Sequence, residues 1–363
     1  MYNTPYISFK YDRLIENYKQ FRRLMPRVNI AYAIKSNSNA DVIRSLAAFG
    51  SGFDVASLNE VHHVRACGIN ASTSPLYYSN PIRSNQVLIK SFQDHQVQHF
   101  VVDSIDGVLM LKDLPEYVKR NVKFYIRLYV SNNQSILPLN SKFGVDINDV
   151  ESMLTAANEV GVNIMGVSFH VGSQCMHPSA FFAPIEMASH VLDLIKYANP
   201  NKSQHWLLDI GGGFPAVEDD SFLDKFAKVI NGTLENFDNM VDVIAEPGRR
   251  MVSNAGTLYT TVVLIKAHNR TKPFAYLDSG VYQGLLEFKQ GMNFNFKSDR
   301  DGELMPWILA GPTCDSFDIV GEVLLPNNLQ VGDVLTMDNA GAYVSETGTC
   351  FNGFIPPNIL RDE

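Results

Sequence analysis

The sequence has few cysteines, no cluster of basic residues and no long apolar run. Its four cysteines, Cys67, Cys175, Cys314 and Cys350, form no CxxC pair and show no metal-ligand spacing, so neither a disulfide framework nor a metal site is expected. So few cysteines in 363 residues indicate a reducing compartment. Residues 1–10 lack the charged start and apolar core of a signal peptide, and no apolar stretch is long enough to cross a bilayer. We therefore expect a cytoplasmic protein without a membrane partner.

The charge balance is acidic. The chain has 38 Asp and Glu against 30 Lys and Arg, a formal net charge of -8, which argues against a nucleic acid polymer as a partner. Hydrophobic residues make up 45% and charged residues 19%, as in ordinary globular proteins. The length exceeds that of one typical domain, so one large and one smaller domain are expected.

Apolar runs typical of buried parallel strands alternate with amphipathic helical patterns over about the first 240 residues. We predict helices at 12–24, 40–49, 58–67, 147–160, 178–197 and 221–231, and strands at 29–35, 52–56, 76–79, 99–103, 123–130, 164–171, 206–210 and 241–245. Eight strands of roughly even spacing, each followed by a crossover, predict an α/β fold with a (β/α)8 TIM-like barrel over residues 10–250. A doubly wound open sheet is the alternative.

The last part of the chain, residues 251–363, is rich in strand-like runs separated by Gly, Pro and Asn-Asn turns. This pattern predicts an antiparallel β-sandwich or β-barrel domain. The strand-like residues 6–9 precede the first helix. They could pair with the strands of this β-domain. We therefore assign residues 1–9 plus 251–363 to this second domain.

Polar residues and glycines follow several of the predicted barrel strands. In a barrel of this kind the catalytic groups lie at the C-terminal ends of the strands, so these side chains are expected to meet at one mouth. Lys35 is the central one, because a partly desolvated amine becomes nucleophilic near neutral pH and forms a Schiff base with an aldehyde. The others are Asp54, Arg127, His170, Gly211–Gly213, Glu246, Gly248 and Arg249.

Each of these positions also has a structural interpretation. Taken alone, Lys35 fits better a solvated lysine that closes a strand, and His170 a core histidine. Gly211–Gly213 fits a flexible loop as well as a backbone cradle for a phosphate. Glu246 and Arg249 fit a salt-bridged turn. None of these short motifs is specific by itself.

Six motifs taken together are specific. In chain order they are AYAIKSN around Lys35, GFDVAS around Asp54, SFHVGS from Ser168 to Ser173, LDIGGGF ending at Phe214, AEPGR ending at Arg249 and GPTCD ending at Asp315. The set closely resembles the pyridoxal-phosphate decarboxylases of the ornithine, arginine and diaminopimelate group, which have the alanine-racemase-like barrel of fold type III. The resemblance runs from about residue 5 to the C-terminus.

The resemblance implies pyridoxal 5'-phosphate (PLP) as the cofactor. Lys35 would hold its aldehyde, and His170 would stack on its ring. Asp54 and Arg127 resemble family positions near the lysine and the ring. The phosphate would be held by Ser173, Gly212, Gly213, Gly248, Arg249 and the hydroxyl of Tyr343.

Glu246 would hydrogen-bond the ring nitrogen and keep it protonated, which makes the cofactor a strong electron sink. Related racemases place an arginine there, so an acid favours decarboxylation. In similar enzymes Cys314 and Asp315 enter the site from a partner subunit, where the cysteine protonates the product carbon and the acid faces the substrate side chain. The resemblance therefore implies a homodimer with shared sites. Cys314 as an inert thiol of the β-domain is the alternative.

The sequence departs from the family pattern at the side-chain pocket. Family members acting on basic substrates carry an acid where this chain has Ser279, and Asp278 is displaced by one residue. One residue of displacement along a strand points a side chain to the opposite face. Asp315 is retained, whereas diaminopimelate enzymes usually have Glu there. The predicted substrates are ornithine-, lysine- or arginine-like amino acids, which suggests polyamine biosynthesis, or bulkier derivatives.

Three alternatives follow. One is decarboxylation of an aminocarboxypropyl group on a larger intermediate such as a peptide nucleotide of the microcin C type. The second is an amino-acid racemase on the same barrel. The third is a non-catalytic regulatory homologue, against which the presence of Lys35, Glu246 and Cys314 argues.

Overall fold

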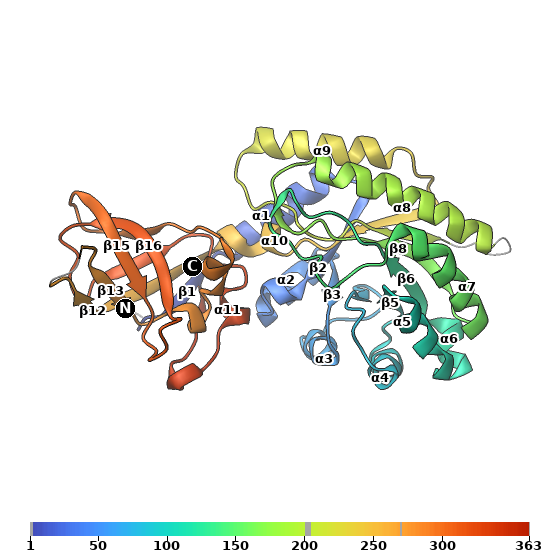
Figure 1. Ribbon diagram of the computed structural model, residues 1–363, viewed down its shortest axis with the longest axis horizontal. Helices are drawn as coiled ribbons and strands as arrows, with labels where there is room; N and C mark the ends of the chain where they lie inside the picture. The colour runs from blue at the N-terminus through green and yellow to red at the C-terminus, as the bar shows by residue number, and fades with distance from the viewer. Residues whose placement is uncertain (1–2, 200–204, 269–270, 363) are drawn as a thin grey trace. The chain divides into compact units, whose positions relative to one another are not determined.

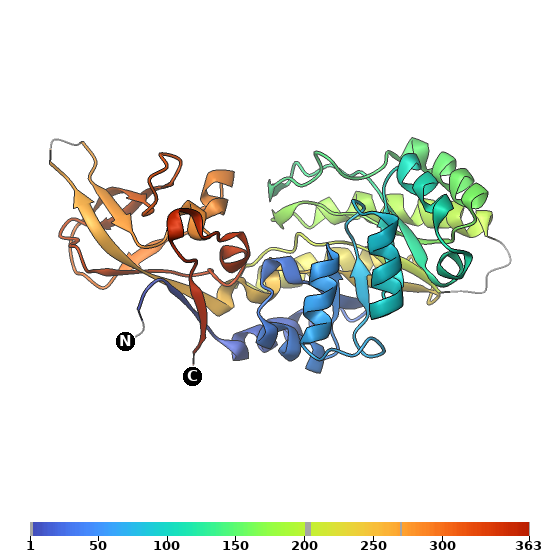
Figure 2. The same cartoon turned by 90° about the horizontal axis from the view of Figure 1, so that it is seen from below.

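The computed structural model describes residues 3–199, 205–268 and 271–362, shown in two views in Figures 1 and 2. The chain divides into two compact units. The barrel unit comprises Tyr18–Lys35 and Ala40–Arg250. The β-unit comprises Met1–Asn17, Ser36–Asn39 and Met251–Glu363. Compared with the ranges expected from the sequence, residues 10–17 and the turn 36–39 belong to the β-unit.

The barrel unit contains the predicted closed parallel barrel. Its last strand pairs with its first, Val243 opposite Val28, and this closure rules out the doubly wound alternative. Strands such as β3, β8 and β10 are buried along their whole length, as expected of a parallel sheet covered on both faces. The strands are β2 (Val28–Ala33), β3 (Gly52–Val55), β4 (Leu76–Tyr78), β5 (His99–Val102), β6 (Lys123–Arg127), β8 (Ile164–Ser168), β10 (Trp206–Asp209) and β11 (Val241–Ala245).

Helices surround these strands (Figure 1). Several begin at a serine or aspartate whose side chain accepts a backbone N–H of the first turn, as Ser57 does from Glu60 at 3.2 Å. No helix in the described ranges is both long and apolar enough to cross a membrane. These helices are α1 (Tyr11–Leu24), α2 (Ala40–Ala48), α3 (Leu58–Ala66), α4 (Asn85–His95), α5 (Ile105–Leu109), α6 (Glu116–Asn121), α7 (Val150–Val160), α8 (Ser179–Ala198), α9 (Asp220–Leu234) and α10 (Arg249–Val252). One more helix, α11 (Val344–Thr347), belongs to the β-unit.

Some predicted strands end earlier than the apolar pattern indicated. Lys35 lies in a 3-10 turn, η1 (Ile34–Ser36), rather than at the end of β2. The polar turn that follows explains the early end, because the side chain of Asn37 accepts the backbone N–H of Asn39 at 3.0 Å and so competes with strand pairing. His170 likewise lies two residues beyond β8.

The β-unit is built on one sheet of eight strands. The N-terminal strand β1 pairs antiparallel with β12 and parallel with β18, so residues 6–9 are part of this sheet. The expected all-antiparallel sheet is wrong in two places, since β13 and β15 also pair in parallel. The long connection 278–303 crosses between these two strands and lets them run in the same direction. The strands are β1 (Tyr6–Phe9), β12 (Gly256–Lys266), β13 (Phe274–Leu277), β14 (Phe296–Ser298), β15 (Leu304–Ala310), β16 (Ile319–Pro326), β17 (Val334–Met337) and β18 (Asn358–Arg361).

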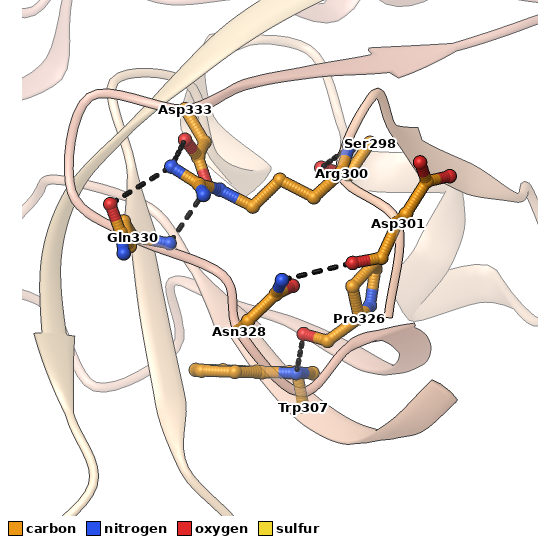
Figure 3. Close-up of polar contacts among 8 residues, drawn as sticks. All are labelled: Ser298, Arg300, Asp301, Trp307, Pro326, Asn328, Gln330 and Asp333. Atoms are coloured by element: carbon orange, nitrogen blue, oxygen red, sulfur yellow. Dashed lines mark hydrogen bonds and ion pairs between the residues drawn. The ribbon is translucent and has the colours of Figure 1, made fainter. Parts of the chain in front are cut away.

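The turns at one end of this sheet are tied together by polar contacts (Figure 3). The guanidinium of Arg300 donates to Asp333 through two nitrogens, one at 2.6 Å, and to Gln330 at 3.0 Å. The indole N–H of Trp307 donates to the carbonyl of Pro326 at 3.2 Å within the β15–β16 hairpin. Because the Trp307 ring is buried in the core, its polar atom needs this partner.

Candidate active site

Lys35 and Asp54 form an ion pair at the mouth of the barrel. Nζ of Lys35 lies 2.6 Å from Oδ2 of Asp54, and the side chains are 44% and 2% exposed. Asp54 is brought there by β3, in which it pairs with Ala33 of β2. The lysine therefore has an accessible amine whose position is fixed by a buried carboxylate.

Glu246 follows β11 and is 7% exposed. Its Oε1 atom has no hydrogen-bond partner among the described residues. Burial raises the pKa of Glu246, and the negative charge of Asp54 raises it further, whereas Lys35 lowers it. A buried carboxylate oxygen without a donor is costly unless a bound group supplies one. The site therefore fits a ligand with an N–H group at this point.

Asp209, at the end of β10, lies beside Glu246 and was not among the predicted site residues. Burial and the neighbouring Glu246 hold the pKa of Asp209 well above its usual range. Its Oδ1 accepts the backbone N–H of Gly211 at 2.8 Å. Two adjacent buried carboxyls resist double ionisation, and the pKa of each is raised, so the pair favours holding one proton between them.

His170 is held neutral above the glycine turn. Its Nδ1 accepts the backbone N–H of Gly172 at 3.0 Å, so the ring proton is on Nε2. Burial lowers the pKa of His170 well below its usual range, and the charges of Arg127 and Lys35 act in the same direction. A neutral imidazole of fixed orientation is suited to stacking on a flat ring.

The glycine turn after β10 has no space for side chains. Gly211 and Gly213 have φ values of +66° and +98°, which favour glycine. A Cβ at Gly213 would lie 2.2 Å from the carbonyl oxygen of Gly172, and one at Gly212 would lie 2.8 Å from Nε2 of His170. The turn therefore exposes backbone next to the histidine, as a phosphate cradle requires.

Ser173 and Arg249 meet beside this turn. Both are buried, and Nε of Arg249 donates to Oγ of Ser173 at 3.4 Å. Gly248 immediately precedes Arg249, the first residue of α10. Arg127, the last residue of β6, has its guanidinium 4.7 Å from the centre of the Phe143 ring. The barrel unit thus carries the residues proposed for the cofactor other than Tyr343.

Two buried hydroxyls at strand ends were also missed from the sequence. Ser79 follows β4 and lies close enough to Glu246 to lower its pKa, and Ser168 ends β8. Neither Oγ makes a hydrogen bond of normal length within the described part of the chain. Their position at strand ends was the available signal, but serine is too common there for it to be specific.

In the β-unit, Cys314 and Asp315 lie in the turn between β15 and β16, and both are exposed. Oδ1 of Asn352 accepts both the backbone N–H and the thiol of Cys314, at 3.1 Å each. Asp315 accepts the backbone N–H of Phe317 at 2.9 Å and the hydroxyl of Tyr282 at 2.5 Å. Both contacts lower the pKa of Asp315, and the backbone hydrogen bond from Phe317 has the larger effect. Asp315 is therefore a carboxylate at neutral pH.

The carboxylate of Asp278 is hydrogen-bonded to three threonines. Its carboxylate accepts the Thr260 hydroxyl at 2.6 Å, the Thr261 backbone N–H at 3.0 Å and the Thr4 hydroxyl at 2.5 Å. Ser279 is fully buried, with no partner for its Oγ in the described residues. The carboxylate of Asp278 is therefore not available to replace the acid that family members carry at the position of Ser279.

Tyr343 lies in a left-handed turn with φ of +65°. Its backbone N–H donates to the carbonyl of Ser36 at 2.7 Å, inside the β-unit. The side-chain amide of Asn37 also donates to the carbonyl of Gly341, at 2.9 Å. The turn that follows Lys35 is thus held by the segment that carries Tyr343.

Comparison with known proteins gives a consistent result. A family model described as "Pyridoxal-dependent decarboxylase, pyridoxal binding domain" matches residues 11–253. The lysine/ornithine decarboxylase of Selenomonas ruminantium is 30% identical over 368 residues, covering 99% of this chain and 90% of its own. The ornithine decarboxylase of Caenorhabditis elegans is 31% identical, with 99% and 88% covered. The solved structure of a lysine/ornithine decarboxylase from Vibrio vulnificus complexed with putrescine has a TM-score of 0.88 at 28% identity, covering 100% of this chain and 95% of that one.

Proposed function

Because the chain belongs to the pyridoxal-dependent decarboxylases, we propose that it removes the α-carboxyl group of an L-amino acid whose side chain ends in a cation. That it is a PLP-dependent amino-acid decarboxylase follows from the family and from its lysine- and ornithine-decarboxylase relatives. The choice of substrate and the roles of the residues are the proposal. The observation that carries the roles is the buried, unpartnered Oε1 of Glu246.

The barrel residues fit the cofactor. Oε1 of Glu246 would accept the N–H of the pyridine ring. The glycine turn at Gly212 and Gly213 would hold the phosphate by backbone N–H groups, together with Gly248, Arg249, Ser173 and the hydroxyl of Tyr343. His170 would lie against the ring, and Asp54 and Arg127 would border the lysine and the ring.

The chain's own groups bind, orient and move protons. When bound, PLP accepts the electron pair that loss of CO2 leaves on the α-carbon. Lys35 would hold the cofactor aldehyde through Nζ and release it to the α-amine of the substrate, with Asp54 fixing the position of Nζ. Glu246 would retain the proton on the ring nitrogen. Cys314 would deliver a proton to the α-carbon after CO2 has left.

The substrate preference rests on charge. Asp315 is a carboxylate next to Cys314, which suits a terminal ammonium or guanidinium group. The relatives named as lysine and ornithine decarboxylases and the neighbour complexed with putrescine support such substrates. With Asp278 engaged by threonines and Ser279 neutral, the pocket offers one carboxylate rather than two. This observation favours a second candidate, a bulkier α-amino acid such as an aminocarboxypropyl conjugate.

We further propose a homodimer in which Cys314 and Asp315 serve the site of the partner subunit, as the resemblance implies. Four free cysteines support a reducing location, for which we propose the cytoplasm.

The test is chemical trapping combined with a substrate panel. The purified protein is incubated with PLP and reduced with borohydride. The masses of its proteolytic peptides are then measured by mass spectrometry. We expect a pyridoxyl group on Lys35, none in Lys35→Ala, and CO2 release from lysine or ornithine by the intact protein. A label on another lysine would refute the role of Lys35. CO2 release from bulky conjugates alone would select the second candidate, and conversion to the other enantiomer without CO2 would indicate a racemase.

A further inference from the structure

One side chain controls the position of Cys314. Oδ1 of Asn352 lies 3.1 Å from the backbone N and 3.1 Å from Sγ of Cys314. A backbone N–H can only donate, so the oxygen rather than the nitrogen of the amide faces the cysteine. The same oxygen has a second lone pair for the thiol, whose hydrogen it accepts.

Asn352 is fixed independently of the cysteine. It has φ of 55° and ψ of 16° within the turn η7 (Phe351–Gly353), a left-handed conformation that asparagine adopts more readily than most residues. The N–H of Gly353 closes this turn on the carbonyl of Cys350 at 2.9 Å. The amide oxygen is thus presented by the backbone of the turn.

The turn is anchored to the segment that holds Asp315. The backbone N–H and the hydroxyl of Thr349 donate to the carbonyl of Tyr282 at 2.7 and 3.2 Å. The rings of Phe351 and Tyr282 lie 4.6 Å apart, and the hydroxyl of Tyr282 donates to Asp315. Two anchored side chains, Asn352 and Tyr282, therefore hold the two adjacent residues Cys314 and Asp315.

We propose that Asn352 is a positioning residue that orients the thiol of Cys314 through its S–H group, so that the thiol can donate its proton. An acceptor oxygen stabilises S–H and repels S⁻. In the step served, the S–H bond breaks and a C–H bond forms at the carbon that lost CO2, leaving a thiolate that water reprotonates. This inference rests on the proposed function, because it takes Cys314 as the proton donor.

The first test measures thiol reactivity in the holoenzyme. Iodoacetamide alkylates the thiolate rather than the thiol, and the Cys314 and Cys350 peptides are quantified separately. Asn352→Ala removes one acceptor, so alkylation of Cys314 is expected to be about fivefold faster, the effect of one ordinary hydrogen bond. Asn352→Asp keeps an acceptor and should alkylate Cys314 no faster than the wild type. Cys350 should not change in either variant.

An unchanged rate at Cys314 in Asn352→Ala would overturn the proposal. Equal acceleration at Cys314 and Cys350 would do so as well, because it would mean that the turn has merely loosened. Asn328→Ala, at an exposed asparagine elsewhere in the β-unit, is the matched control and should leave both rates unchanged.

The second test counts products. With the wild type we expect one molecule of amine for each molecule of CO2 released. In Asn352→Ala we expect less than one amine per CO2, because the proton is delivered to the α-carbon less reliably. Asn352→Asp should restore the ratio. One amine per CO2 in Asn352→Ala would contradict the positioning role. If the wild type releases no CO2 at all, the proposed function fails, and the alkylation comparison still decides whether Asn352 holds the thiol.

Discussion

At the scale of single residues, the buried carboxyls of the barrel divide their work by environment. Asp54 is paired with an ammonium group at 2.6 Å, burial and the neighbouring Glu246 raise the pKa of Asp209, and Oε1 of Glu246 has no hydrogen-bond partner among the described residues. All three side chains are nearly inaccessible to solvent. Water therefore does not screen the differences between their electrostatic environments. The oxygen without a partner is the reason why we assign the bound group to Glu246 in the proposed function.

Replacement of Glu246 by Gln tests this division. Glutamine has the same shape but no charge, so it cannot keep the ring nitrogen protonated. We expect CO2 release to fall by at least about 100-fold, or about 2.7 kcal/mol in the barrier, while PLP absorbance after purification is retained. Glu159→Gln, on the exposed face of α7, is the control. A loss of less than about threefold would be inconsistent with the role given to Glu246.

A second prediction concerns Asp315. Its replacement by Asn removes the charge but keeps the size, so kcat/KM for lysine should fall about tenfold or more, since charge-assisted hydrogen bonds are the strong ones. Norleucine, which has no terminal ammonium, should be processed equally by both proteins. An equal decrease of kcat/KM for lysine and for norleucine would show that Asp315 does not interact with the charge of the substrate side chain.

The residues of the site were predictable to different extents. Lys35, His170 and Glu246 follow barrel strands in motifs that identify the family, and the strands themselves are visible as apolar runs. Asp209 and Ser79 were missed, because their importance comes from burial next to Glu246, and the sequence does not show which strand ends become neighbours. Asn352 was missed for the same reason, since 38 residues separate it from Cys314.

At the scale of structural elements, one buried carboxylate joins two loops of the β-unit. Asp318 accepts the backbone N–H of Val281 at 2.7 Å, and the N–H and hydroxyl of Thr313 at 3.1 and 2.7 Å. A Cβ at Gly280 or Gly311 would come within 2.3 Å of its oxygens, so glycines are needed for this close approach. The loop after β13 and the loop carrying Cys314 therefore share one anchor.

Removal of this anchor by Asp318→Ala leaves three donors without a partner. We expect the β-unit to lose about 2–5 kcal/mol of stability, the range for breaking a buried charged network. Urea unfolding, with hydrogen exchange followed in residues 279–284 and 311–318, measures the effect. Asp301→Ala, at an exposed position, should change little. Unaltered exchange in both loops would show that the anchor is dispensable.

The alternation of strands and helices was sufficient to predict the barrel, because each unit is local in sequence. The mixed character of the β-sheet was not predictable in this way, because the parallel pairs β1–β18 and β13–β15 join segments that are distant along the chain. The boundary between the units also escaped prediction. The turn after Lys35 belongs to the β-unit through contacts with residues about 300 positions later.

At the scale of the whole molecule, pH acts on stability through a histidine enclosed in the barrel. Nδ1 of His99 and the hydroxyl of Tyr125 share a hydrogen bond, and burial raises the pKa of Tyr125, so that this hydroxyl keeps its proton. Burial also lowers the pKa of His99 to about 3. The unfolded chain, with a histidine pKa of about 6.5, therefore binds a proton that the folded protein does not.

The sign follows from this difference. The contribution of His99 is fully present above about pH 6.5 and is lost as the pH falls towards 3. Stability measured by urea unfolding between pH 7 and 5 should decline less steeply in His99→Gln, which keeps an acceptor for Tyr125 but does not titrate. His205→Gln, at an exposed histidine, should keep the wild-type slope. Identical slopes in all three proteins would refute the assignment.

The pairing of β1 has a consequence for the order of synthesis. Both of its neighbours, β12 and β18, lie after the last barrel strand, so β1 is synthesised before the barrel but can pair only after all the barrel strands have been synthesised. The barrel strands can all assemble earlier, while Tyr6–Phe9 waits for a sheet whose final strand ends at Arg361. Truncation of the nascent chain before that point would leave an unpaired strand edge exposed to chaperones and proteases.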